Sequence, residues 1–363
     1  MEGRPEIANL RPYEPGRPAD ALRRELGVNQ VVKLASNEGP LGPFPSVVER
    51  LREAVPLLNR YPELSHDLRK RLAERHGVAP QRIWAGNGAV SIIGDLALAL
   101  LRPGDEVLMG WPSFVAYPIG ATAMGAAPVQ VPLRSTGVLD LDAMAGRIGE
   151  RTRIVYACSP NNPTGGIVHS DELRRFAERV PQDVLLVVDA AYHEYVTDPG
   201  YGDAVADLGD LPNVAVLRSF SKVYGLAGMR VGYMVGPPEV VAAVSKIAHP
   251  FGVSELAHVA AIASLDDQGE VERRREANTH ERERLRVGLE KLGLRPLPAE
   301  GNFLFADVGD GRELAGRLER AGVIVRPLEP FGAPSAVRIT VGLPEENEAL
   351  LQALAACLEP ATT

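Results

Sequence analysis

The stretch Val214-Ala-Val-Leu-Arg-Ser-Phe-Ser-Lys-Val-Tyr-Gly-Leu-Ala-Gly-Met-Arg230 joins a short apolar run directly to a polar loop. Its first part, Val214–Arg218, has the composition of a strand that is buried on both faces of a mostly parallel sheet. The loop that follows holds serine, lysine, glycine and arginine side by side. Similar strand-like runs recur through the middle of the chain. The repeated buried strands therefore indicate the fold class.

The neighbouring strand-like runs are Glu106–Met109, Val129–Pro132, Ile154–Cys158, Val184–Asp189 and Val231–Val235. Between the runs the sequence has helical patterns such as Asp171–Arg179, for which Ser170 is the expected N-terminal cap. Strands that alternate with helices predict an α/β fold in which helices cover both faces of a mostly parallel central sheet.

The pattern changes after about Leu265. Two helical and three strand-like segments follow: Glu270–Leu292, Phe303–Phe305, Ile324–Arg326, Val337–Val341 and Glu345–Leu358. We expect residues 37–265 to form a large domain and residues 266–363 a smaller α+β domain. Residues 1–36 are expected to form an N-terminal arm and part of the small domain, because the prolines of Arg11–Pro18 exclude a helix there.

Composition and charge exclude several classes of protein. The 363 residues carry 39 Lys and Arg against 47 Asp and Glu, a net charge of −8, which disfavours a nucleic-acid partner. The N-terminus has no apolar signal segment, and the longest apolar stretch, near Asp95–Leu101, is too short to span a membrane. Cys158 and Cys357 give neither a disulfide framework nor a zinc pattern. We expect a cytoplasmic protein without a metal, membrane or nucleic-acid contact.

Lys222 is the first candidate for chemistry, since the chain has only five lysines against 34 arginines. The hydroxyls of Ser219 and Ser221, together with Arg230, would form a phosphate cradle beside its amine. A desolvated lysine near a cation has a lowered pKa and forms an imine with an aldehyde. The alternative is an ordinary surface lysine in a glycine-rich loop.

Asp189 ends a strand-like run, and ligands in α/β sheets bind at the carboxyl ends of strands. Its carboxylate could pair with the protonated nitrogen of a pyridine ring. A helix cap or a metal ligand is the alternative for Asp189. The turn around Pro163 presents the amide of Asn162, which could share a ring oxygen with the phenol of Tyr192. On composition alone that segment is simply a turn.

Two further segments could contact the same ligand. Small residues open an apolar helix at Gly88 and Ala89, where exposed backbone N–H groups would form an anion site. Phe114 follows the run Glu106–Met109, and its ring could stack on a flat cofactor, although core packing explains it equally well.

Taken together, these segments resemble the fold type I pyridoxal-phosphate aminotransferases and, among them, the histidinol-phosphate aminotransferase family. The matching segments cover nearly the whole chain in order: Leu34-Ala-Ser-Asn37-Glu38, Asn59-Arg-Tyr61-Pro-Glu, Ser159-Pro-Asn-Asn-Pro-Thr-Gly165, Asp189-x-Ala-Tyr192, Ser219-Phe-Ser-Lys222, Gly228-Met-Arg230-Val-Gly, Gly301-Asn302-Phe303 and Val337-Arg338-Ile-Thr.

The resemblance implies pyridoxal 5'-phosphate as cofactor, held as a Schiff base on Lys222, which also moves the proton during transamination. It implies that Asp189 pairs with the pyridine nitrogen and that Asn162 and Tyr192 contact the ring hydroxyl. Phe114 would stack on the ring face. The implied phosphate contacts are Ser219, Ser221, Arg230 and the amides of Gly88 and Ala89.

For the substrate, the resemblance implies that Arg338 binds the carboxylate and that Arg326 and Tyr13 recognise a substrate phosphate, with Asn37 also at the substrate. Tyr61 would reach the cofactor phosphate of a neighbouring subunit, which implies a homodimer with shared active sites. The implied activity is transamination between histidinol phosphate and 2-oxoglutarate in histidine biosynthesis.

The sequence departs from the family pattern in three single residues and one short segment. Ala190 stands where Glu is usual, Gly252 where Asn is usual and Phe114 where Tyr is usual, and residues 86–89 replace a commonly acidic segment. Because Gly252 and residues 86–89 are expected to border the substrate, an aromatic-amino-acid aminotransferase of the same subfamily is the main alternative. A decarboxylase on the same fold or a non-catalytic ligand-binding protein is less favoured. The sequence argues against a nucleotide-binding module, because no Gly-x-Gly-x-x-Gly motif opens a helix after the first strands.

Overall fold

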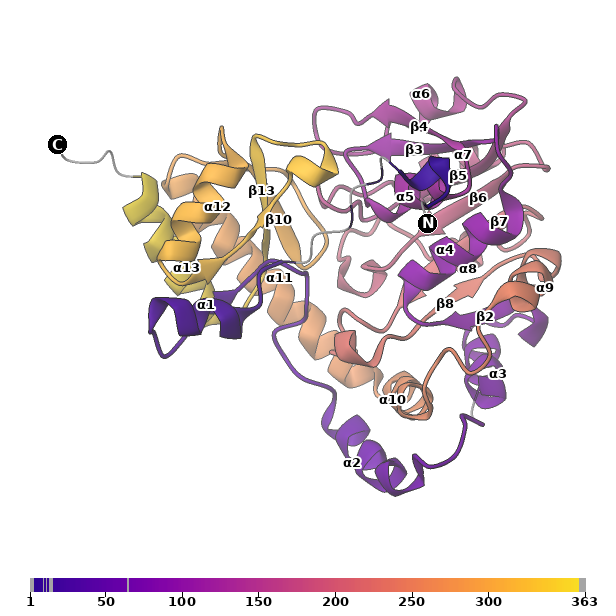
Figure 1. The fold of residues 1–363 in the computed structure, drawn as a ribbon, viewed down its shortest axis with the longest axis horizontal. Helices are drawn as coiled ribbons and strands as arrows, with labels where there is room; N and C mark the ends of the chain where they lie inside the picture. Colours follow the sequence, from indigo (N-terminus) through magenta and orange to yellow (C-terminus); the bar gives the residue numbers. More distant parts are fainter. Residues whose placement is uncertain (1–2, 9, 11, 13–15, 64, 359–363) are drawn as a thin grey trace.

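The computed structural model describes residues 3–8, 10, 12, 16–63 and 65–358. Figure 1 shows a large body around a central sheet and a smaller body that carries the C-terminal helices. The expected residue Tyr13 lies outside the described residues, as does part of the proline-rich arm. Among the described residues, no helix is both long and apolar enough to cross a membrane.

The large body is built on a seven-stranded sheet with the order β2-β8-β7-β6-β5-β3-β4. The strands are β2 (Ile83–Gly86), β3 (Glu106–Trp111), β4 (Ala127–Pro132), β5 (Thr152–Cys158), β6 (Leu185–Asp189), β7 (Val214–Ser219) and β8 (Gly232–Val235). The neighbours from β7 to β4 pair in parallel, and β8 is antiparallel to both β7 and β2. The predicted α/β fold with a mostly parallel sheet is confirmed, whereas the short strand β2 was not predicted.

Helices cover both faces of this sheet, so its strands are buried on both sides. Successive side chains of a strand point to opposite faces and therefore enter different apolar clusters. On β6, Leu186 and Val188 belong to one apolar cluster, and Leu185 and Val187 belong to another. The first face is covered by α2 (Pro45–Ala54), α3 (Ser65–His76), α6 (Leu141–Ala145), α7 (Ser170–Ala177), α8 (Ala204–Asp207) and α10 (Glu255–Leu265). The second face is covered by α4 (Ala89–Leu100), α5 (Ala116–Ala123) and α9 (Pro238–Ile247).

Helix α7 begins one residue earlier than predicted. Ser170 is its first helical residue, and His169 occupies the cap position without a side-chain hydrogen bond. The Ser170 hydroxyl instead donates to the carboxylate of Asp207 in α8. The predicted cap is therefore wrong, because a neighbouring helix that is distant in sequence offers this hydroxyl a charged acceptor.

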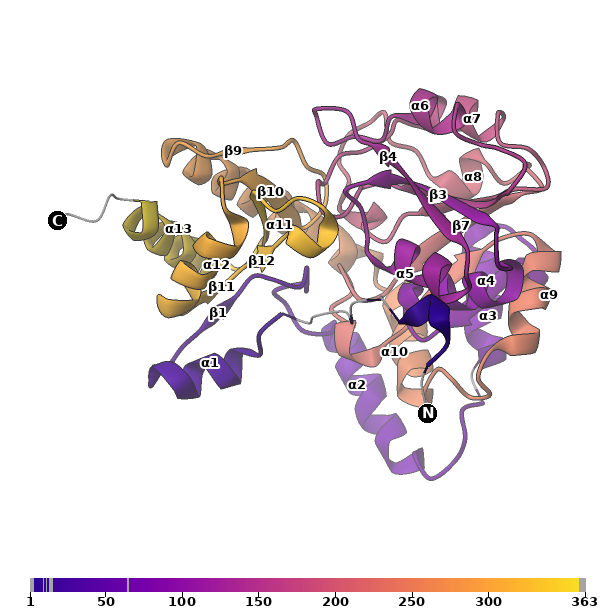
Figure 2. The ribbon, with the colours of Figure 1, turned by 45° about the horizontal axis from the view of Figure 1, so that its top comes forward.

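The smaller body holds an antiparallel sheet with the order β12-β13-β10-β9. Its strands are β9 (Arg295–Pro296), β10 (Phe303–Asp307), β12 (Arg326–Pro327) and β13 (Ala336–Thr340). Its helices are α1 (Ala19–Leu26), α11 (Gln268–Lys291), α12 (Gly311–Arg320) and α13 (Pro344–Leu358). In Figure 2 the N-terminal α1 lies beside this body rather than the large one.

One predicted strand, Ile324–Arg326, is wrong. The segment divides into β11 (Val323–Ile324), which pairs in parallel with the N-terminal strand β1 (Val32–Lys33), and β12, in which Arg326 lies opposite Arg338. Two different partners therefore split one apolar run. The division at residues 36/37 and 265/266 stays a prediction.

Candidate active site

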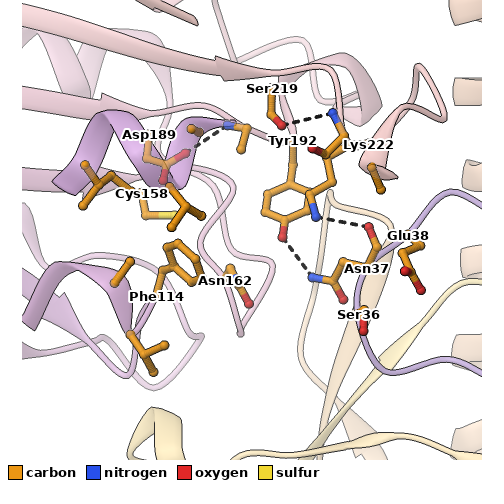
Figure 3. Close-up of a pocket in the computed structure, with 18 of the residues that line it drawn as sticks. Ser36, Asn37, Glu38, Phe114, Cys158, Asn162, Asp189, Tyr192, Ser219 and Lys222 are labelled. Atoms are coloured by element: carbon orange, nitrogen blue, oxygen red, sulfur yellow. Dashed lines mark hydrogen bonds between the residues drawn. The ribbon is translucent and has the colours of Figure 1, made fainter. Parts of the chain in front are cut away.

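The carboxyl ends of β5, β6 and β7 open into a cavity of about 640 Å³ on the side of the small body. Figure 3 shows the side chains that point into it. The predicted site residues that line this cavity are Asn37, Ala89, Phe114, Asn162, Asp189, Tyr192, Ser219, Ser221, Lys222, Arg230 and Arg338. The fold thus gathers residues that are up to about 300 positions apart in the chain at one edge of the sheet, as expected for α/β proteins.

Lys222 points its amine into the cavity. The Nζ atom donates a hydrogen bond to the backbone carbonyl of Asn37 at 3.2 Å and lies 5.1 Å from the centre of the Tyr192 ring. Burial, followed by the positive charge of Arg338, lowers the pKa of Lys222 to about 8. The neutral amine, which is the form that attacks a carbonyl carbon, is therefore far more abundant near neutral pH than in a free lysine.

Asp189 lies at the deep end of the cavity and is only 5% exposed. One carboxylate oxygen accepts a hydrogen bond from the Tyr117 hydroxyl at 2.6 Å, and the other accepts from the backbone N–H of Ala191 at 3.1 Å. Burial raises the pKa of Asp189, while these two donors and Lys222 lower it. Among the described residues, no group of three or more His, Cys, Asp or Glu side chains could hold a metal ion.

Asn37 connects the two bodies on the side of the cavity that faces the small body, which we call the mouth. Its side-chain amide donates to the Tyr192 hydroxyl at 3.0 Å, and its backbone N–H donates to the Thr340 hydroxyl of β13 at 2.9 Å. The backbone of Asn37 is left-handed, with φ of 52°, a conformation that Asn tolerates better than most residues. The phenol, the lysine amine and the small-body sheet are thus held by one residue.

Arg338 is buried and already bonded within the protein. Its Nη1 donates to the side-chain oxygen of Asn162 at 2.5 Å, and its Nη2 donates to the carbonyl of Ala35 at 2.8 Å. Because the Asn162 oxygen accepts from this guanidinium, the N–H₂ group of Asn162 is the part that can donate to a ligand oxygen. The guanidinium carbon of Arg338 also lies 5.6 Å from the ring centre of Phe331.

A second set of groups suits an anion. Gly88, with φ of 81°, immediately precedes α4, whose first residue Ala89 lines the cavity, and the N-terminus of a helix attracts an anion. A Cβ at Gly88 would approach Nη2 of Arg230 to 2.6 Å, so glycine is required for this close approach. Arg230 donates to Ser221 Oγ at 3.3 Å, and Ser219 Oγ accepts from the Ser221 N–H at 3.1 Å. A guanidinium, two hydroxyls and a helix N-terminus therefore converge.

Phe114 both packs and lines the cavity. Its ring meets the Tyr117 ring edge-on, with centres 5.7 Å apart and planes at 85°, and it packs against two apolar clusters. Ala191 also lines the cavity. The two predictions for Phe114, core packing and contact with a ligand, are compatible in this position.

Some lining or supporting residues were not predicted from the sequence. Cys158 and Phe331 line the cavity, and Tyr117 stands behind Asp189. Tyr117 gave no signal in the sequence, because its contact joins it to a residue 72 positions away and Phe114 lies before the start of α5. Phe331 gave none, since it lies in a short 3-10 helix of the small body.

Three predicted residues that the structure describes are not among those that line this cavity: Gly88, which precedes the lining residue Ala89, Tyr61 and Arg326. Tyr61 is 74% exposed and stacks on Phe251, with ring centres 4.4 Å apart. Arg326 is the strand neighbour of Arg338 but is not among the described residues that line the cavity. Gly252 lines a separate cavity of about 500 Å³ together with Phe251 and Gly86.

Comparisons with known proteins fit this geometry. The sequence model of "Aminotransferase class I and II" matches residues 29–354. A histidinol-phosphate aminotransferase of Moorella thermoacetica is 43% identical, over 97% of this chain and 92% of that protein. An aromatic amino acid aminotransferase of Streptomyces avermitilis is 44% identical, over 96% of this chain and 95% of that protein.

Solved structures show the same fold. The crystal structure of histidinol-phosphate aminotransferase from Sinorhizobium meliloti in complex with pyridoxal-5'-phosphate has a TM-score of 0.89 and 30% identity, over 98% of this chain and 96% of that one. Aspartate aminotransferase from Thermus thermophilus has a TM-score of 0.87 and 26% identity, over 98% and 100%. The chain therefore belongs to the aminotransferase class I and II family and is a pyridoxal-phosphate-dependent aminotransferase.

Proposed function

We propose that this enzyme binds pyridoxal 5'-phosphate at Lys222 and transfers an amino group from histidinol phosphate to 2-oxoglutarate, as part of histidine biosynthesis. The observation that carries the cofactor part is the partly buried Lys222 amine, whose pKa is lowered to about 8, in one cavity with the Asp189 carboxylate. The substrate part is supported by the names of the relatives and by two adjacent arginines on β12 and β13.

The residues present fit this cofactor. Arg230, the two serines of the loop and the amides at Gly88 and Ala89 would hold its phosphate, because a guanidinium and a helix N-terminus both attract such a group. Asp189 would hold the ring nitrogen in its cationic form. The hydroxyl of Tyr192 and the amide of Asn162, with Phe114 against the ring face, would complete the contacts.

Once bound, the cofactor supplies a ring that withdraws the electron pair released when the donor loses its α-proton. The protein supplies the proton transfer and the orientation. The Lys222 amine would take the α-proton from the donor and deliver it on the far side of the donor nitrogen, a 1,3-proton shift, which is general acid–base catalysis by a group whose pKa lies near neutral pH. Asn37 holds the Lys222 amine and the Tyr192 phenol in place before the substrate arrives.

Two different amino donors must fit the same pocket. On the carbon that bears the amino group, glutamate carries a carboxylate where histidinol phosphate carries a phosphomethyl group, and guanidinium groups bind both anions. Arg338 lines the cavity, and Arg326 lies opposite it on the neighbouring strand. The guanidinium carbon of each arginine lies 5.6 Å from the ring centre of Phe331. We assign Arg338 to the carboxylate and Arg326 to the phosphate, with Tyr13 as an additional hydroxyl from the N-terminal arm.

An aromatic-amino-acid aminotransferase is the second candidate. Relatives with that name are as similar as the histidinol-phosphate enzymes. The cavity wall is also rich in apolar side chains, including Phe114, Ile119 and Phe331, which suit an aromatic ring. The two candidates share the chemistry and differ only in the donor.

We also propose a homodimer in which Tyr61 reaches the cofactor phosphate of the partner subunit. Tyr61 does not line the cavity of its own chain, and Phe251, on which it stacks, is 58% exposed. Val55, Leu57 and Leu58 are also exposed in the segment just before Tyr61. Apolar side chains that gather in this way commonly mark a subunit interface.

The test is kcat/KM for histidinol phosphate and for phenylalanine, each with 2-oxoglutarate as acceptor. We expect histidinol phosphate to be the preferred donor. A preference for phenylalanine or tyrosine would replace the proposal with the aromatic aminotransferase. Light scattering of the holoenzyme would reject the dimer if the active species had the mass of one chain.

A further inference from the structure

Tyr117 is a buried tyrosine of α5 that is 1% exposed and is not among the residues that line the cavity. Its hydroxyl lies 2.6 Å from one carboxylate oxygen of Asp189. This is the short distance that is typical of an O–H donor on a charged oxygen. The sequence places these residues 72 positions apart, so only the tertiary fold creates the contact.

The position of the Tyr117 hydroxyl is fixed by ring packing. The Tyr117 ring stacks on the Tyr156 ring, with centres 4.2 Å apart and planes at 12°, and meets the Phe114 ring edge-on. Tyr117 therefore contacts two residues that we assign to the cofactor, Asp189 at its nitrogen and Phe114 at its face. Movement of Tyr117 would displace both.

The pKa shifts indicate which of the two groups donates the hydrogen bond. Burial raises the pKa of Tyr117 well above its usual value, so the phenol stays protonated and donates. Burial also raises the pKa of Asp189, and the hydrogen bond from Tyr117 opposes that rise. A donor to the charged form of a buried acid favours that form. Without the hydroxyl, the buried carboxyl would hold a proton more readily.

We propose that Tyr117 is a positioning residue of the reaction: it keeps Asp189 ionised and aimed at the ring nitrogen of the cofactor. This inference rests on the proposed role of Asp189. A neutral Asp189 could not pair with a cationic ring nitrogen, and the ring would then withdraw electrons less strongly. Because Tyr117 does not line the cavity, its hydroxyl acts through Asp189, to which it donates.

The test compares Tyr117→Phe with Tyr156→Phe. Both variants remove one buried phenol hydroxyl from the same stacked pair, but only Tyr117 donates to Asp189. We expect kcat to fall at least about tenfold in Tyr117→Phe, the loss typical of a hydrogen bond to a charged group, and to change little in Tyr156→Phe.

A spectroscopic readout separates positioning from folding. In a pH titration of the holoenzyme's visible absorbance, the midpoint should move to higher pH in Tyr117→Phe, because a less cationic ring repels a further proton less. The melting temperature of each apoenzyme records any structural damage. An unchanged midpoint and an unchanged kcat in a folded Tyr117→Phe enzyme would overturn the inference.

A double-mutant cycle distinguishes this inference from the proposed function. In an Asp189→Asn enzyme, the added Tyr117→Phe change should have almost no further effect on kcat, because the group through which Tyr117 acts has lost its charge. Additive effects of the two changes would overturn the positioning role while leaving Asp189 in place. A wild-type protein that acquires no visible absorbance with pyridoxal phosphate would overturn the proposed function and, with it, this inference.

Discussion

The two ends of the cavity are built in different ways. The deep end, by which we mean the side formed by the central sheet, has Asp189 as the last residue of β6 and Lys222 three residues after the end of the neighbouring strand β7. The mouth, with Asn37 and Arg338, is assembled from a connecting segment and from the small body, and its groups are bonded across the two bodies. The comparison teaches that the residues proposed for the reaction are set by the sheet, whereas those proposed for donor choice depend on how two bodies meet.

The largest effect should follow from removing the amine at the deep end. Lys222→Ala should abolish transamination and leave the fold intact, because an imine requires a primary amine. Single-turnover and steady-state assays measure the loss, with the exposed Lys246→Ala of α9 as a matched control. Weak binding of cofactor through the phosphate contacts should remain. Turnover close to that of the wild type would eliminate the assignment of Lys222.

The second effect concerns the other group at the deep end. Asp189→Asn should bind cofactor but turn over at least about a hundredfold slower, since a lost charge-assisted contact of about 1.5–3 kcal/mol adds to a weakened electron sink. The exposed Asp171→Asn of α7 serves as a control for the change in charge. A decrease of less than about fivefold would show that Asp189 does not serve the ring nitrogen.

How far the sequence predicts the molecule follows the same division. Asp189 and Lys222 were predictable, because an apolar run fixes each strand and a parallel sheet gathers the strand ends. Tyr117 was not, since its contact with Asp189 requires the packing of a helix against the sheet. The predicted strand at Ile324 failed for the same reason: its backbone pairs with Lys33 of the N-terminal strand, a partner that periodicity cannot reveal.

A change at the mouth should be smaller and selective for the donor. Arg326→Ala should lower kcat/KM for histidinol phosphate more than for phenylalanine, by about 1.5–3 kcal/mol for one lost charged hydrogen bond. Arg312→Ala, an exposed arginine of α12 that pairs with Glu329, is the matched control. If both donors slow equally, Arg326 supports the structure of the mouth and does not read the phosphate.

The smallest expected effect depends on groups at both ends of the cavity, because Arg338 influences the pKa of Lys222. With a pKa of about 8, Lys222 in the apoenzyme is mostly protonated at pH 7 and mostly neutral at pH 9. The neutral fraction rises about tenfold between these values, so the rate of imine formation with added pyridoxal phosphate should rise by about that factor. Stopped-flow absorbance measured from about pH 6.5 to about pH 9.5, a range that brackets the pKa of Lys222, would locate the midpoint of this rise in rate.

Arg338 at the mouth contributes to that midpoint, because its positive charge disfavours a second cation on Lys222. Arg338→Met should therefore raise the pKa of Lys222, and the rise in the rate of imine formation should move to higher pH. Burial alone would still hold the midpoint below that of a free lysine, since desolvation is the larger cause. The exposed Arg312→Met, which is far less buried, should leave the midpoint unchanged. Identical midpoints in Arg338→Met and the wild type would show that the two ends of the cavity are electrostatically independent.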